Sequence, residues 1–188
     1  MELDEYRIES EPELESSDRK IIFSGKHIIN AIDKKLNKKV TLRESTKNLD
    51  DDDFSHVVQI KMINEMFLSQ SCRNEKLLRR EIEKKISGYK AQDIDKQFYD
   101  AELLISLSDT IEKLVESKLK CHYCNCEVLL LYKNVRDPFQ WSLDRIDNSK
   151  CHSRENTIIA CLKCNLQRRT QNMNKFLFTK QLKITKQD

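Results

Sequence analysis

The chain of 188 residues has no run of about 18 apolar residues, the length that a membrane-spanning helix needs. Its opening, MELDEYRIESEPELESSD, is acidic and lacks the basic and apolar regions of a signal peptide. Apolar residues make up 38% of the chain and charged residues 35%, too little apolar material for a large hydrophobic core. These absences predict an intracellular protein, cytoplasmic or nuclear, with no membrane partner. Its length suits one ordinary domain, or a small domain with a helical extension.

Seven cysteines are the most informative feature of the composition. In an intracellular protein they are better interpreted as thiols and metal ligands than as disulfides. Four of them form two Cys-x-x-Cys pairs with 36 residues between them, Cys121/Cys124 and Cys161/Cys164. Each pair can place two thiolates on one cation, and two pairs complete the tetrahedral shell of a structural zinc. Two alternatives stay open: Cys126 could displace Cys124, and Cys151 could reach a metal from its loop.

Charge is distributed unevenly along the chain. Residues 119–188 contain thirteen Lys and Arg against six Asp and Glu, a balance of +7. Since the whole chain carries +3, residues 1–118 carry −4. The half with the paired cysteines is therefore basic, and a polyanion such as nucleic acid is its expected partner.

Residues 1–118 contain no visible chemistry. Eight acidic residues among the first twenty predict a disordered arm over residues 1–20. Residues 21–118 predict an α-helical extension, which offers a surface to a protein partner. One helix is expected from Ser55 to Gln70, with a buried face formed by Val57, Ile60, Ile63 and Phe67. A second is expected from Asn74 to a left-handed cap at Gly88, and one or two more between residues 91 and 118.

The segment around the cysteine pairs alternates short β-prone runs with polar sequence. The expected elements are a strand over Val128–Tyr132, a strand over Trp141–Leu143 that ends at Asp144, a polar loop over 145–156, a strand over Thr157–Ala160 and a helix over Leu162–Asn172. This order brings the strand end at Asp144 near the helix start at Asn165.

Three groups of residues in this segment carry a recognisable pattern by their order along the chain. They are the run Ser142-Leu143-Asp144-Arg145-Ile146-Asp147, then Asn156, then Cys161-Leu162-Lys163-Cys164-Asn165 followed by Arg168. The combination resembles the zinc-containing HNH nucleases of the ββα-metal, or His-Me finger, superfamily, and looks most like HNH proteins of phages and large DNA viruses. The resemblance covers less than a third of the chain.

The resemblance implies an α+β fold with a C-terminal zinc-stapled ββα-metal (HNH) module and an α-helical N-terminal extension. The module is expected over residues 119–175, and a basic C-terminal tail over 176–188. The implied activity is that of a metal-dependent DNA endonuclease, which hydrolyses phosphodiester bonds.

By the same resemblance, Asp144 and Asn165 correspond to the ligands of one catalytic Mg²⁺ or Mn²⁺, and Asn156 to the residue that braces the loop. A carboxylate and an amide oxygen are hard ligands that leave water positions open for phosphate oxygens. The metal would stabilise charge on the scissile phosphate and on the leaving oxygen.

One position departs from the family pattern. The usual motif has a histidine directly after the metal-binding aspartate, whereas this chain has Arg145. A guanidinium stays protonated near neutral pH, which makes it a poor general base and a good phosphate clamp. His152, the only imidazole in the loop, is one candidate for the base. It could instead serve the zinc or be a solvated loop residue, and Asp147 is the second candidate for orienting water or binding the metal.

Basic residues around the module are expected to contact DNA phosphates, which would give salt-sensitive binding with little base reading. They are Arg145, Arg168, Arg169 and Lys175. The arginine at position 145 also favours an alternative function: a catalytically degenerate HNH-fold zinc module, which binds DNA or a protein partner without cleaving.

Overall fold

A computed structural model describes residues 25–30 and 40–182. The chain divides into two compact units, Met1–Lys39 and Val40–Asp188, and in the first unit only a short helical segment is described. The predicted acidic arm and the last six residues of the predicted basic tail lie outside the described residues. All other described elements belong to the second unit.

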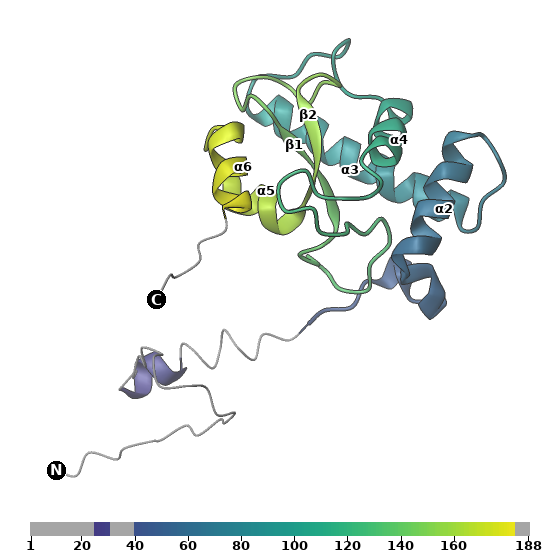
Figure 1. Cartoon of the computed structure of the whole chain (residues 1–188), viewed down its shortest axis with the longest axis horizontal. Coiled ribbons are helices and arrows are strands. Elements are labelled where there is room, and N and C mark those ends of the chain that lie inside the picture. Colours follow the sequence, from purple (N-terminus) through teal and green to yellow (C-terminus); the bar gives the residue numbers. More distant parts are fainter. Residues whose placement is uncertain (1–24, 31–39, 183–188) are drawn as a thin grey trace. The chain divides into compact units, whose positions relative to one another are not determined.

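The second unit combines helices with a small antiparallel sheet (Figure 1). In chain order its elements are η1 (Glu44–Thr46), η2 (Asp51–Phe54), α2 (His56–Phe67), α3 (Glu75–Asp95), α4 (Leu107–Glu116), β1 (Trp141–Arg145), β2 (Thr157–Cys161), α5 (Leu162–Arg168) and α6 (Met173–Gln181). The strand register places Trp141 opposite Cys161 and Arg145 opposite Thr157. The predicted α+β class is confirmed.

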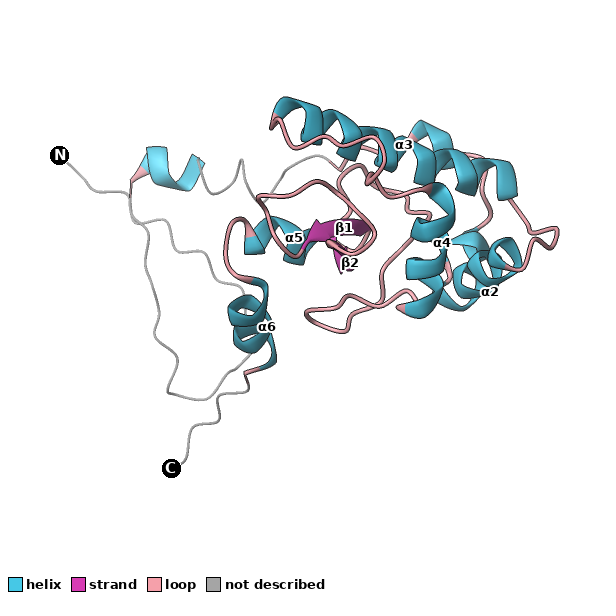
Figure 2. Cartoon of the chain, turned by 90° about the horizontal axis from the view of Figure 1, so that it is seen from above, coloured by secondary structure: helices cyan, strands magenta, loops and turns pink. Residues whose placement is uncertain are grey.

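The hairpin β1–β2 lies between two groups of helices. In both views α2 and α4 lie on one side of it, and α5 and α6 lie on the other (Figures 1 and 2). One continuous core joins the helical segment to the cysteine segment, and it includes Met62, Ile82, Leu114, Tyr123, Leu131 and Trp141. The predicted division at residue 118 therefore separates two stretches of sequence within one packed body, since Val40 onward forms a single compact unit.

The first predicted strand of the module, Val128–Tyr132, does not form. Its only ladder contact among the described residues is a single parallel bridge from Leu129 to Gln140. The fully buried side chain of Gln59, on α2, takes the place of a neighbouring strand. Its Oε1 accepts hydrogen bonds from the backbone N–H groups of Leu130 and Leu131, at 2.7 and 3.2 Å. Because a buried side chain satisfies this backbone, the segment packs as core without joining the sheet.

Helix α3 continues past Gly88, where the sequence predicted its end. The reason is tertiary packing beyond the glycine: Tyr89 is 8% exposed and Asp93 is fully buried. Burial of the Tyr89 ring against His152, with the carboxylate of Asp93 accepting the backbone N–H of His152, outweighs the cost of a glycine within a helix, about 1 kcal/mol. The longer helix extends as far as Asp95 and passes along β1.

The helix predicted over Leu162–Asn172 begins where expected but ends four residues early, at Arg168, and a separate helix begins at Met173. Arg169 ends α5 with a left-handed φ of 52°, and Asn172 caps the start of α6. The Oδ1 atom of Asn172 accepts hydrogen bonds from the backbone N–H groups of Asn174 and Lys175, at 3.0 and 3.2 Å. A side chain that caps a new helix thus competes with continuation of the first.

Candidate zinc centre and polar cleft

The two cysteine pairs converge into one cluster. The Sγ atoms of Cys121, Cys124, Cys161 and Cys164 all lie within 4.8 Å of one another. Neighbouring sulfurs in a tetrahedral zinc site lie roughly 3.8 Å apart, given a Zn–S bond of about 2.3 Å. The sulfurs of Cys124 and Cys161 are 3.9 Å apart, so the cluster is positioned to hold a metal ion and is compatible with structural zinc.

Local backbone geometry brings the first pair together. Asn125 adopts a left-handed φ of 55°, and its backbone N–H donates to the carbonyl of Cys121 at 2.9 Å. The N–H of Cys121 donates to the carbonyl of Cys126, also at 2.9 Å. His122 then joins this turn to the hairpin, because its N–H donates to the carbonyl of Ile159 at 2.9 Å.

The second pair lies where β2 becomes α5. Cys161 is the N-cap of that helix, and its sulfur accepts the backbone N–H of Cys164 at 3.4 Å. Neither Cys126 nor Cys151, the two open alternatives, belongs to the four-sulfur cluster. Since Cys161 also ends β2, a metal on this cluster would fix the position of the β2–α5 junction.

Without a metal, the thiols of Cys121 and Cys164 would remain protonated at neutral pH. A hydrogen bond with the thiol of Cys161 and burial raise the pKa of Cys121 to about 12. Burial and the neighbouring Cys121 likewise raise the pKa of Cys164 to about 12. Metal loading would therefore release protons, and the free energy of metal binding would contribute directly to folding.

A cleft of about 660 Å³ lies between α3, β1, α5 and the loop between the strands. Four of the predicted catalytic residues line it, namely Asp144, Arg145, His152 and Asn165. Three further basic residues contribute to its wall, namely Lys85, Lys96 and Arg169, and burial lowers the pKa of Lys85 to about 7. The cleft thus gathers acidic, amide, imidazole and cationic side chains from distant parts of the sequence.

Asp144 is nearly buried at the end of β1, with 5% of its surface exposed. Its Oδ2 accepts a hydrogen bond from the hydroxyl of Tyr123 at 2.5 Å, and its Oδ1 accepts one from Nη1 of Arg168 at 2.8 Å. Burial raises the pKa of Asp144, although both partners oppose that shift. Arg168 therefore neutralises the carboxylate from within the protein.

The expected DNA contact of Arg168 does not match its position. Its side chain is 1% exposed, and its Nη2 donates to the carbonyl of Ile146 at 3.0 Å. The physical reason is that the buried carboxylate of Asp144 needs a cationic partner. This guanidinium is consequently not available to a phosphate.

Asn165 lies in the first turns of α5. Its Nδ2 donates to Oγ of Ser142 and to the carbonyl of Leu143, both at 3.1 Å. The Oδ1 atom makes no hydrogen bond within the described part of the chain, so it is the atom left to accept a ligand.

Arg145 is also positioned differently from the expected phosphate clamp. It is 6% exposed, and its Nη1 donates to the carbonyl of Lys150 at 3.0 Å. The same atom lies 3.6 Å from Oδ1 of Asp93. All five residues of β1 are buried, so the side chain of Arg145 finds its partners inside the protein.

His152 is buried in the loop between the strands, with 3% of its surface exposed. Its Nδ1 lies 2.7 Å from Oδ1 of Asp93, and its backbone N–H donates to Oδ2 of Asp93 at 2.7 Å. The ring stacks on Tyr89 with centroids 4.7 Å apart. Burial lowers the pKa of His152, although the hydrogen bond with Asp93 raises it. The interpretation as a solvated loop residue is therefore wrong, and His152 lies outside the four-sulfur cluster.

Asn156 holds the loop closed. Its Oδ1 accepts the backbone N–H of Asp147 at 2.8 Å, and its Nδ2 donates to the carbonyls of Asp147 and Cys151 at 3.0 and 2.9 Å. The carboxylate of Asp147 accepts hydrogen bonds from the N–H and hydroxyl of Ser149, which lower its pKa. Asp147 and Asn156 therefore shape the loop beside the cleft, and neither lines it.

Arg169 and Lys175 are exposed, unlike the other two residues expected to contact DNA. Arg169 lines the cleft directly after α5, and its carbonyl accepts a hydrogen bond from Nδ2 of Asn148 at 3.2 Å. Lys175 lies on α6. Arg169 thus places accessible positive charge in the wall of the cleft, whereas Lys175 does not line it.

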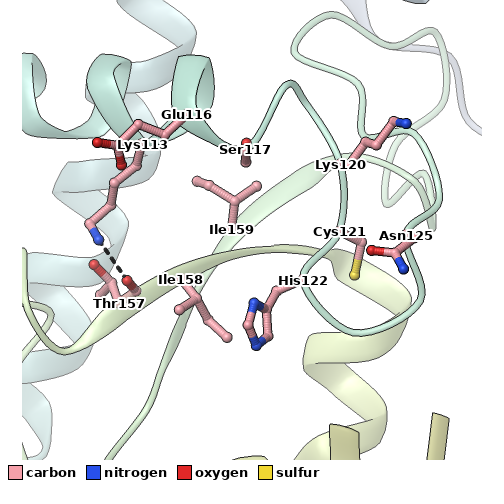
Figure 3. A pocket seen from close by; sticks show the side chains of 10 residues that line it. All are labelled: Lys113, Glu116, Ser117, Lys120, Cys121, His122, Asn125, Thr157, Ile158 and Ile159. Atoms are coloured by element: carbon pink, nitrogen blue, oxygen red, sulfur yellow. Dashed lines mark hydrogen bonds between the residues drawn. The ribbon is translucent and has the colours of Figure 1, made fainter. Parts of the chain in front are cut away.

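A second hollow, of about 400 Å³, lies beside the first cysteine pair (Figure 3). Lys113, Lys120 and His122 contribute cationic or polar groups to it, and Cys121 lies among its lining residues. The ammonium group of Lys113 donates to the carbonyl of Thr157 at 2.8 Å, shown as a dashed line in Figure 3. No predicted catalytic residue lines this hollow, so the candidate chemistry belongs to the larger cleft.

Comparison with known proteins gives one informative similarity. The chain is 38% identical over 66 residues to an uncharacterised protein of Acanthamoeba polyphaga mimivirus. The match covers 35% of this chain and 11% of the viral protein, so the chain spans about a tenth of that relative's length. No family model matches the chain, and no solved structure matches it. Among the described helices, none is both long and apolar enough to cross a membrane.

Proposed function

We propose that the protein is a metal-dependent DNA endonuclease of HNH type, which hydrolyses phosphodiester bonds in the cleft beside its zinc centre. One observation carries the proposal: Asp144, Asn165 and His152, from a strand end, a helix start and a loop, line the same cleft. The β2–α5 junction that positions Asn165 also carries two of the four clustered cysteines.

Asp144 and Asn165 are the residues that would hold a Mg²⁺ or Mn²⁺ ion. Each carboxylate oxygen has two lone pairs, so the hydrogen bonds from Tyr123 and Arg168 leave acceptor capacity on both oxygens of Asp144. Together with Oδ1 of Asn165, these oxygens suit a hard cation. The ion, when bound, would stabilise negative charge on the scissile phosphate and on the leaving oxygen.

The chain's own groups would supply the remaining steps. His152 would accept a proton from the attacking water, since a neutral imidazole suits that task near neutral pH. Arg169, exposed at the edge of the cleft, would neutralise a backbone phosphate. Zinc would act only as a structural ion.

Replacing Asp144 with Asn is expected to reduce nicking of supercoiled plasmid by at least about 100-fold, because polarisation by a bound ion is worth several kcal/mol. Full-length, zinc-loaded protein would be assayed on a gel with Mg²⁺ and with Mn²⁺. The matched control is Asp95→Asn, an exposed carboxylate at the end of α3, which should nick like the wild type. Equal nicking by Asp144→Asn and wild type would point to a contaminating nuclease and overturn the proposal.

A second candidate function is favoured by two observations at the same site. Arg168 and Tyr123 already bind both oxygens of Asp144, and a buried Arg145 stands at the family's histidine position. Both features would suit a zinc module that binds DNA or a protein partner without cutting. Such a module would shift DNA in a gel with strong salt dependence, and no divalent ion would produce cleavage.

A further inference from the structure

Asp93 is the most deeply buried carboxylate in contact with the cleft residues. It lies on α3, beyond Gly88, and is fully buried. Both of its oxygens are directed at one residue, since Oδ1 lies 2.7 Å from Nδ1 of His152 and Oδ2 accepts the backbone N–H of the same residue at 2.7 Å. Two bonds from one carboxylate fix the position of the backbone and of the ring together.

We propose that Asp93 is a positioning residue, which holds His152 in the tautomer with its proton on Nδ1 and leaves Nε2 as the proton acceptor of the cleft. This inference rests on the proposed endonuclease function. An ionised carboxylate only accepts hydrogen bonds, so the nitrogen that faces it must be the donor. In a neutral imidazole the other nitrogen is then unprotonated. The Nε2 atom of His152 makes no hydrogen bond within the described residues, and His152 lines the cleft.

Arg145 supports this arrangement from β1. Its Nη1 lies 3.6 Å from Oδ1 of Asp93, so a cation and a carboxylate face one another inside the protein. The arginine at the family's histidine position thus contacts the residue that orients an imidazole seven positions further along the chain. Arg145 and His152 share one buried carboxylate.

The charged and titratable groups that face His152 act in opposite directions. Burial lowers the pKa of the imidazole, and the cations Arg145 and Lys96 lower it as well. Asp93 raises the pKa, and Tyr89 stacks on the ring. Loss of the negative charge at position 93 would therefore lower the pKa of His152 further.

The tautomer can be measured without any activity. In ¹⁵N NMR spectra of the full-length, zinc-loaded protein above neutral pH, His152 is expected to show an unprotonated Nε2 and a protonated Nδ1. In Asp93→Asn, the amide can offer only one acceptor oxygen, so the fixed tautomer should be lost. Asp95→Asn, two positions along the same helix, should leave the spectrum unchanged. A wild-type spectrum with the proton on Nε2 would overturn the inference, whether or not any variant folds.

Kinetics separate a positioning role from a purely structural one. Asp93→Asn should reduce nicking by about 100-fold or more, the range of general-base catalysis. In the pH–rate profile of its residual activity, the fall in rate on the acid side should move to lower pH. The reason is that loss of the charge at position 93 lowers the pKa of His152. Asp93→Glu, which keeps the charge, should restore part of the rate and return this fall toward its wild-type position.

The outcomes distinguish this inference from the proposed function. Unchanged tautomer, rate and pH profile in a folded Asp93→Asn would refute the role of Asp93 while the nuclease stands. A wild-type protein that never nicks DNA would refute the nuclease, and the tautomer would then decide whether Asp93 positions the imidazole.

Discussion

Loss of any one clustered cysteine is expected to abolish metal binding and unfold the segment around the hairpin. In Cys164→Ser, elemental analysis should find far less than the one zinc per chain expected of the wild type. The sharp thermal unfolding transition should disappear as well. Apparent free energies of structural zinc binding are about 10–16 kcal/mol in small zinc modules. That is comparable to the whole stability of a typical domain, about 5–15 kcal/mol.

The chain offers two matched controls for this prediction. Cys72 lies between α2 and α3, outside the cluster, and Cys72→Ser should keep its zinc. Cys126→Ser tests the competing ligand, and it should also keep zinc, because Cys126 is not among the four converging sulfurs. A chelator-treated protein that retains its cooperative transition and its near-ultraviolet signal from Trp141 would contradict the prediction.

The cysteine cluster and the hairpin were predictable because their signals are local. The spacing within each Cys-x-x-Cys pair already restricts two sulfurs to one cation. The strands are short, bounded runs, and β1 extends only one residue beyond the predicted end at Asp144. Local spacing in the sequence was therefore enough to predict that these elements exist.

Which face of α2 is buried could not be predicted from local signals in the same way. Val57 and Phe67 were expected on its buried face, yet they are 75% and 47% exposed. The helix instead buries Gln59 completely, because this side chain satisfies backbone groups of the segment near Leu131. An apolar periodicity cannot reveal a polar residue whose partner lies 72 positions away.

The sequence also could not show which charged side chains are buried and which are exposed. Asp93 and His152 are 59 positions apart in the sequence, and nothing near Asp93 indicates a partner. Arg168 and Arg169 are adjacent and read identically as candidate DNA contacts. The structure buries the first on Asp144 and exposes the second. Only long-range packing decides which of two equal charges is desolvated.

These adjacent arginines should therefore give opposite results. Arg168→Met is expected to lower the free energy of unfolding by about 3–5 kcal/mol, because it leaves the buried carboxylate of Asp144 without its cation. Arg169→Met should change stability by no more than about 0.5 kcal/mol, as surface substitutions do. Urea unfolding of the zinc-loaded proteins measures both values.

A double variant and a DNA titration complete the comparison. In Asp144→Asn/Arg168→Met the unpaired charge is removed, so part of the lost stability should return, which identifies the ion pair as the cause. Arg169→Met should weaken DNA binding. It should also reduce the slope of log affinity against log salt concentration by about 1, as expected for the loss of one phosphate contact. If Arg168→Met were as stable as the wild type and lost DNA affinity instead, its guanidinium would have to leave Asp144 for a phosphate. The carboxylate would then be released for a cation only when DNA is bound.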